Sequence, residues 1–246
     1  MQTRRYFMGV AGTALAQSNI ARANDRIRFG IIGAGERGAY HARRLARDEQ
    51  TDVVSICDVY RKRADAAREG SNPRAEVVQD YRRVLDRKDI DAVVVSLPDH
   101  WHTPVLIDAV TAGKDVYLEK PMTFRIEEGR QIVEAVKRTR RVVQVGAQQK
   151  SGPHFLEAKT RFFDSGLIGK VSLVRTYWIA NRGFFRHAPE NFTYRPEDLD
   201  WTLFLGRAPK RPFDPRRYFG WTMFQDYSTG QPGGVFTHTN RPWWGG

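Results

Sequence analysis

The stretch VYLEKPMT, Val116 to Thr123, places a lysine where a short apolar run ends. Most lysines are solvated surface charges, so the interest of Lys120 lies in its position. Pro121 cannot continue a strand, and it stiffens the turn that follows. A partly desolvated ammonium at such a turn can hold a hydroxyl group, favour its alkoxide and move its proton. Lys120 is therefore a candidate catalytic residue.

A second candidate lies in SLPDHWHTP, Ser96 to Pro104, where Pro98 ends another apolar run. The pattern predicts that His100, Trp101 and His102 lie in the loop after this strand. A lone histidine is more often a satisfied polar residue than a catalyst, but two of them around a tryptophan favour a functional site. No third ligand lies at a recognised metal spacing, so no metal site is expected.

A glycine pattern, Gly33-x-Gly35-x-x-Gly38, stands between an apolar run and a helical pattern. Asp58 closes the second apolar run, 20 residues after Gly38. In this setting the first glycine allows a tight turn, the second lets the backbone approach a pyrophosphate and the third lets the helix pack on the strand. The pattern predicts a dinucleotide site, with a purely structural glycine turn as the alternative.

Asp58 also bears on which dinucleotide binds. A carboxylate that accepts hydrogen bonds from the adenosine ribose repels a 2′-phosphate, which favours NAD. Three cations follow shortly after Asp58 and could bind that phosphate: Arg61, Lys62 and Arg63. The alternative is that they form the solvated start of a helix. NAD is the expected cofactor, and NADP stays open as the alternative.

The elements that position these residues are short β-branched runs alternating with helical patterns. This alternation predicts a doubly wound parallel sheet with right-handed crossovers in residues 26–147. Because parallel strands end at one edge, Lys120 and the loop from Pro98 should meet in a crevice there. The expected strands are 27–32, 53–57, 92–97, 115–118 and 142–146, and the expected helices are 37–48, 61–70, 103–113 and 126–140.

The alternation of strand and helix patterns ends after residue 150. A helix over 155–165 and a strand over 171–178 are expected, followed by a Pro-, Trp- and Phe-rich chain with little periodicity. Residues 151–246 are therefore interpreted as an incomplete second α/β domain with an irregular tail, 231–246. The fold class is thus α/β, a Rossmann sheet followed by a partial second domain.

Composition narrows the class of protein. The chain has 246 residues, 41% of them hydrophobic, and a formal charge of +12. The densest basic cluster, Lys137 to Arg141, lies at an expected helix end without an aromatic-rich nucleic-acid motif, so no nucleic-acid partner is expected. Cys57 is the only cysteine, which excludes an intramolecular disulfide and a multi-cysteine metal site.

The first 23 residues resemble a twin-arginine export signal. TRRYFMG is followed by a mildly apolar run and the small-residue site ARA at Ala21 to Ala23. The apolar run is shorter than the roughly 20 residues that cross a bilayer, so no stable membrane span is expected. A periplasmic or secreted location is predicted, with a frayed basic terminus and a cytoplasmic location as the alternative.

Together these motifs resemble the Gfo/Idh/MocA oxidoreductases, named for glucose-fructose oxidoreductase and inositol dehydrogenase. The resemblance rests on the glycine pattern with Asp58, PDHWH, EKP and the later segments GLIGK, DWTLFLG, PFDP and DYSTG. It implies sugar or polyol substrates, NAD or NADP, a cis Lys120–Pro121 bond and oligomer contacts through the second domain of a full-length form.

The resemblance also implies a set of site residues. Lys120 and His102 are the expected catalytic residues, with His102 near the nicotinamide. The expected cofactor-binding residues are Gly33, Gly35, Glu36, Arg37, Gly38, Asp58, Arg61, Pro98, His102, Glu119 and Lys120.

The sequence departs from the family pattern after Gly230. An Asp-x-x-x-His element is usual there, but His238 stands at the aspartate position and Pro242 at the histidine position. The chain is therefore expected to be a truncated oxidoreductase with impaired activity. Two alternatives stay open: a glycosidase that oxidises its sugar transiently, and a non-catalytic dinucleotide- or sugar-binding module.

Overall fold

Six parallel strands form one sheet in the order β3-β2-β1-β4-β5-β6. The computed structural model describes residues 26–147, 152–175, 177, 187–230 and 232–237. The predicted doubly wound α/β sheet is confirmed. The strands are β1 Ile27–Ile32, β2 Thr51–Cys57, β3 Glu76–Val78, β4 Ala92–Val95, β5 Asp115–Glu119 and β6 Val143–Gly146.

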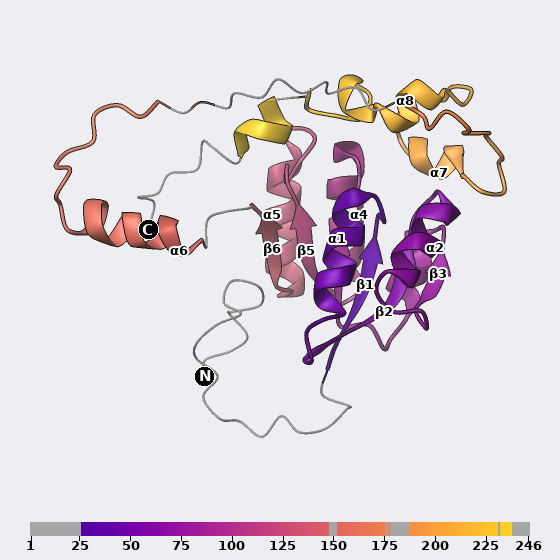
Figure 1. Ribbon diagram of the computed structural model, residues 1–246, viewed down its shortest axis with the longest axis horizontal. Helices are drawn as coiled ribbons and strands as arrows, with labels where there is room; N and C mark the ends of the chain where they lie inside the picture. Colours follow the sequence, from indigo (N-terminus) through magenta and orange to yellow (C-terminus); the bar gives the residue numbers. More distant parts are fainter. Residues whose placement is uncertain (1–25, 148–151, 176, 178–186, 231, 238–246) are drawn as a thin grey trace.

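Helices cover both faces of this sheet (Figure 1). One apolar cluster joins β1, β2 and β4 to alanines of α1 and α2, and the other joins the sheet to α3, α4 and α5. Burial on both faces explains the unbroken apolar runs of the strands, of which β4 is buried at every residue. The helices are α1 Glu36–Leu45, α2 Arg61–Glu69, α3 Tyr81–Asp86, α4 Asp99–Thr111 and α5 Glu128–Thr139.

Three features of this domain differ from the sequence prediction. β3 and α3 are too short to leave a periodic pattern, and they were not predicted. α4 begins at Asp99, so His100 and His102 lie in its first turns and their predicted loop placement is wrong. The predicted helix began at Thr103, whereas Thr103 and Pro104 both lie inside α4.

The chain after the sheet begins with helical turns that pack little. α6, Pro153–Ala158, and the π-helical turn η1, Lys159–Asp164, carry no buried residue. The predicted strand over 171–178 is wrong for its described residues: 171–175 and 177 pair with no strand in the described chain. A β-strand needs a hydrogen-bonded neighbouring strand, and the local sequence pattern does not indicate whether such a neighbour exists.

Residues 187–230, here called the aromatic cap, lie across the end of the sheet near α2 and β3 (Figure 1). Its core is built from Leu199, Trp201, Phe204, Tyr218 and Tyr227, all buried. The cap contains α7 Trp201–Leu205, α8 Pro215–Phe219 and the 3₁₀ turn η2 Trp221–Met223, and a π-helical turn η3, Pro232–Phe236, follows it. No helix among the described residues is long and apolar enough to cross a membrane.

Candidate functional site

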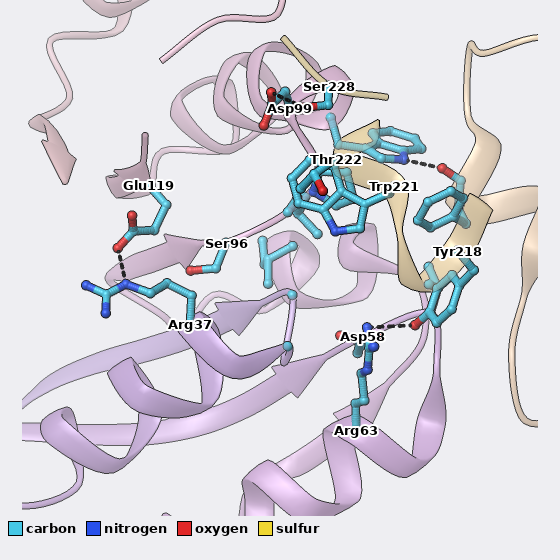
Figure 2. A pocket seen from close by; sticks show the side chains of 18 of the residues that line it. Arg37, Asp58, Arg63, Ser96, Asp99, Glu119, Tyr218, Trp221, Thr222 and Ser228 are labelled. Carbon is cyan, nitrogen blue, oxygen red and sulfur yellow. Dashed lines mark hydrogen bonds and ion pairs between the residues drawn. The ribbon is translucent and has the colours of Figure 1, made fainter. Parts of the chain in front are cut away.

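A cavity of about 610 Å³ lies between the carboxyl edge of the sheet and the aromatic cap (Figure 2). The cavity lies at the carboxyl ends of the neighbouring strands β1 and β4, where the strand order reverses, and open α/β sheets bind ligands at this place. Eight of the predicted site residues line it: Gly33, Gly35, Glu36, Arg37, Asp58, Pro98, Glu119 and Lys120. Gly38, Arg61 and His102 do not.

The glycine loop has the shape that a pyrophosphate requires. Gly33 has a φ of +89°, and a Cβ there would collide with the carbonyl oxygen of Ser96. A Cβ on Gly38 would collide with the carbonyl oxygen of Gly33, so this glycine lets α1 start tightly against the loop. At Gly35 a Cβ would meet no atom within 4 Å, so the backbone faces open space at the start of α1. These residues fit a dinucleotide.

Asp58 lies at the carboxyl end of β2 and is 7% exposed. Its two oxygens accept backbone hydrogen bonds from Ala34 at 2.7 Å and from Tyr60 at 2.8 Å. Burial raises the pKa of Asp58, although the Arg63 charge and both backbone donors oppose the change. The hydrogen bonds thus fix the carboxylate against the glycine loop, where further lone pairs can accept ribose hydroxyls.

Glu119 ends β5 as a buried carboxylate. Its Oε1 accepts from Arg37 Nε at 3.0 Å and lies 2.7 Å from His41 Nε2. Burial alone would raise the pKa of Glu119, but the His41 hydrogen bond and the Arg37 charge outweigh it, so the pKa is lowered. Because Glu119 directly precedes Lys120, these two contacts hold the backbone in place where Lys120 begins.

Lys120 is half-buried, and its ammonium donates to the carbonyl oxygen of Gly234 at 2.8 Å. The Lys120–Pro121 bond is cis, as the family resemblance implied. Burial lowers the pKa of Lys120, and the charges of Glu119 and Asp99 oppose the change. An ammonium has three donors, so the group at the cavity wall can serve a ligand oxygen as well as Gly234.

His102 is 1% exposed, and both of its ring nitrogens face backbone carbonyls. Nδ1 lies 2.5 Å from the oxygen of Pro121 and Nε2 lies 2.8 Å from the oxygen of Leu97. The ring therefore ties the loop after β4 to the turn that carries Lys120. His102 does not line the cavity, and its predicted place near the nicotinamide stays a prediction.

The two arginines at the start of α2 point in different directions. Arg61 has a 57% exposed side chain paired with Asp65 at 3.7 Å, outside the cavity. Arg63 lines the cavity, and its Nη1 donates to Tyr218 Oη at 3.1 Å. The two residues are two positions apart, about half a helical turn, so they lie on different faces of α2. Of the cations that the sequence analysis named, Arg63 lines the cavity and Arg61 does not, and a cofactor contact of Arg61 stays a prediction.

Several cavity residues were not predicted. Asp99 Oδ2 accepts from the Thr229 backbone and hydroxyl, both at 2.8 Å, and from Ser228 at 3.3 Å. These bonds tie the DYSTG segment of the cap to the first turn of α4. Tyr218, Trp221 and Thr222 complete the cap side of the cavity. Asp99 and Ser228 belong to the segments PDHWH and DYSTG that carry the family resemblance, whereas Tyr218, Trp221 and Thr222 had no signal beyond the aromatic-rich composition of 187–230.

No group of three metal-ligating side chains is present in the described parts of the chain. The predicted departures His238 and Pro242 lie outside the described residues, as does the amino-terminal export signal.

Comparison with known proteins assigns the sheet region to a family. Residues 27–147 match the model of the Gfo/Idh/MocA oxidoreductase family, NAD-binding Rossmann fold. Just under half of the chain is thus similar to the NAD-binding Rossmann domain of this family. Glycosyl hydrolase family 109 protein 1 from Shewanella sp. (strain ANA-3) and the α-N-acetylgalactosaminidase of Shewanella oneidensis are each 35% identical over 130 residues.

Those matches cover 50% of this chain and 28% of each relative, so the chain spans under a third of their length in alignment. A crystal structure of myo-inositol 2-dehydrogenase from Lactobacillus plantarum superimposes with a TM-score of 0.55 at 26% identity. The superposition covers 59% of this chain and 43% of the Lactobacillus plantarum chain. The relatives thus include both a polyol dehydrogenase and a glycosidase.

Proposed function

We propose that this protein is an NAD-dependent oxidoreductase that acts on a sugar or polyol. The observation that carries the proposal is the Lys120 ammonium, which lines the same cavity as the glycine loop and Asp58. When bound, NAD would accept or return a hydride. Asp58 would hold the ribose, the backbone at Gly35 would face the pyrophosphate, and Lys120 would bind the reacting hydroxyl and move its proton.

The finer assignment of NAD over NADP rests on Asp58. A 2′-phosphate would lie beside a buried carboxylate, a repulsion of roughly 1 kcal/mol or more where the two charges are partly shielded from water. Titration of the chain with both cofactors tests this. Equal or tighter NADP binding would contradict the preference and assign the 2′-phosphate to the cations Arg61, Lys62 and Arg63.

A second candidate function, NAD-dependent glycoside cleavage, is supported by the 35% identity to the Shewanella oneidensis α-N-acetylgalactosaminidase. The two reactions share sugar oxidation but differ in the net product. The test incubates the purified chain and NAD with a panel of sugars, polyols and nitrophenyl glycosides. Steady NADH accumulation supports the dehydrogenase, and nitrophenol release without NADH supports the glycosidase. NAD binding with neither product would leave a dinucleotide-binding module.

Location outside the cytoplasm is also proposed, on the twin-arginine pattern of the first 23 residues. Expression with and without Arg4→Lys and Arg5→Lys substitutions, followed by cell fractionation, tests it. Export that survives both substitutions would contradict the twin-arginine route.

A further inference from the structure

The adenosine end of the predicted cofactor site is closed by residues that lie outside the Rossmann domain. Asp58 marks this end, because it is the residue expected to hold the adenosine ribose. Figure 2 shows Arg63 and Tyr218 beside Asp58, with Arg37 and Glu119 on the opposite side of the cavity. Tyr218 and its neighbour Phe219 line the cavity together with Arg63.

Arg63 contacts the cap through both a hydrogen bond and ring faces. Its guanidinium lies 4.9 Å from the Tyr218 ring centroid, 5.5 Å from that of Phe219 and 6.0 Å from that of Tyr60. The Tyr218 ring is 2% exposed, and its hydroxyl accepts from the guanidinium. The aromatic rings already hold the guanidinium in one orientation. The Arg63 side chain therefore loses little conformational entropy when a planar ligand group stacks on it or accepts a hydrogen bond from it.

The backbone holds the cap at the same place. Arg61 N donates to Asp198 O at 2.8 Å and Asp200 N donates to Val59 O at 2.9 Å. Between these bonds, Tyr60 and Leu199 form an antiparallel bridge. The cap is therefore hydrogen-bonded to Val59, the residue that follows Asp58, and to Arg61 at the start of α2.

We propose that Arg63 and Tyr218 form the adenosine-side wall of the dinucleotide site, so that the cap supplies part of the binding energy for the adenosine half of the cofactor. The inference rests on the proposed use of NAD, but it does not depend on the substrate or on turnover. It extends the cofactor site beyond residues 27–147, the region that the family model covers.

The test measures binding of NAD, ADP-ribose and nicotinamide mononucleotide to the full chain by calorimetry. Arg63→Met removes the charge and keeps the stem, Arg63→Lys keeps the charge, and Tyr218→Phe removes only the hydroxyl. We expect Arg63→Met to weaken NAD and ADP-ribose about tenfold, which is about 1.4 kcal/mol. Tyr218→Phe should weaken both about threefold, and Arg63→Lys should restore part of the loss. Nicotinamide mononucleotide should change less than twofold.

Two matched controls keep the same chemistry outside the cavity. Arg68→Met removes an arginine of the same helix that pairs with Glu69 outside the cavity, and Tyr194→Phe removes a hydroxyl from a cap ring that stacks on Phe213. Both should leave NAD affinity within twofold. Thermal unfolding of each variant establishes that the cap and the sheet are still folded.

Several outcomes would overturn the proposal. Unchanged NAD and ADP-ribose affinity in Arg63→Met and Tyr218→Phe would show that Arg63 and Tyr218 do not contribute to binding of the adenosine half. An equal loss for nicotinamide mononucleotide would mean that the pair maintains the whole cavity, which also contradicts an adenosine-specific role. A wild-type chain that binds neither NAD nor ADP-ribose would overturn both this inference and the cofactor assignment. The expected binding pattern without any turnover would instead remove only the proposed reaction.

Discussion

The Rossmann domain and the segment 152–177 contain similar apolar residues but place them in opposite environments. In the domain, Phe29, Ile31 and Val94 are at most 2% exposed. In the later segment, Leu167, Leu173 and Tyr177 are 71%, 68% and 72% exposed. The difference lies in partners: each strand of the sheet has a hydrogen-bonded neighbour and a helix layer, whereas 171–175 pair with no other described strand.

The aromatic cap lies between these extremes and shows what decides the outcome. It contains no strand among its described residues, yet it buries Trp201, Tyr218 and Tyr227 by packing on one another and on Tyr60 at the start of α2. Apolar composition alone therefore does not make a core. A ready-made surface, here the end of the sheet, allows an irregular chain to bury its rings.

The largest effect is expected in the sheet. Phe29→Ala removes a buried ring from the cluster that joins the sheet to α1 and α2, so it should lower the free energy of unfolding by about 3–5 kcal/mol. Urea unfolding followed by far-UV circular dichroism measures the loss. A change below about 1 kcal/mol would contradict the picture of a close-packed core.

Lys120→Met should have the next largest effect, on chemistry instead of stability. In the sugar-dependent NADH assay, turnover should fall by about 10²-fold or more, because a positioned proton-transfer group is removed. NAD affinity should stay within about threefold, since Lys120 follows Glu119, which Figure 2 shows on the side of the cavity opposite Asp58. Turnover that survives within a few fold would make the lysine a structural residue.

Glu119 predicts a pH dependence of stability at the edge between sheet and cap. Its pKa is lowered in the folded chain, so its contribution is complete above the ordinary value of 4.5 and is lost as the pH falls through the folded value. Glu119→Gln should cost about 1–3 kcal/mol at pH 7, because the donors Arg37 and His41 lose a charged acceptor.

The difference in unfolding free energy between wild type and Glu119→Gln should shrink as the pH falls below 4.5 and reach its smallest value below the lowered folded pKa, where both proteins carry a neutral group. Chemical unfolding of the two proteins from pH 7 to pH 3 measures it, and the comparison cancels the other carboxylates. A difference that stays constant over this range would contradict the ionic role of Glu119.

The smallest effect is expected in the exposed segment. Leu173→Ser replaces a 68% exposed side chain and should change the free energy of unfolding by no more than about 0.5 kcal/mol. This substitution sharpens the contrast with Phe29→Ala in the same urea experiment. A loss of several kcal/mol would instead show that Leu173 is covered in solution, for example by a second copy, and dependence of the loss on protein concentration would identify that case.

Local patterns in the sequence were sufficient for the sheet and for much of the cavity edge. Apolar runs, glycine spacing and the Lys120–Pro121 turn each act over a few residues, so β1, β2, β4 and β5 and the positions of Gly33, Asp58 and Lys120 could be predicted without a structure. The parallel arrangement then placed these residues at one edge, because strands that run the same way end on the same side.

Contacts between distant parts of the chain were decided only by the tertiary structure. His102 faces two carbonyls instead of the cavity, Arg63 lines the cavity whereas Arg61 does not, and the cap contributes Tyr218 from 155 residues away. Such contacts depend on which helical face meets which loop, a matter of about 100° per residue along a helix, and on a surface that exists only once the sheet has formed. The sequence determined which groups could do chemistry, and packing determined which of them share one cavity.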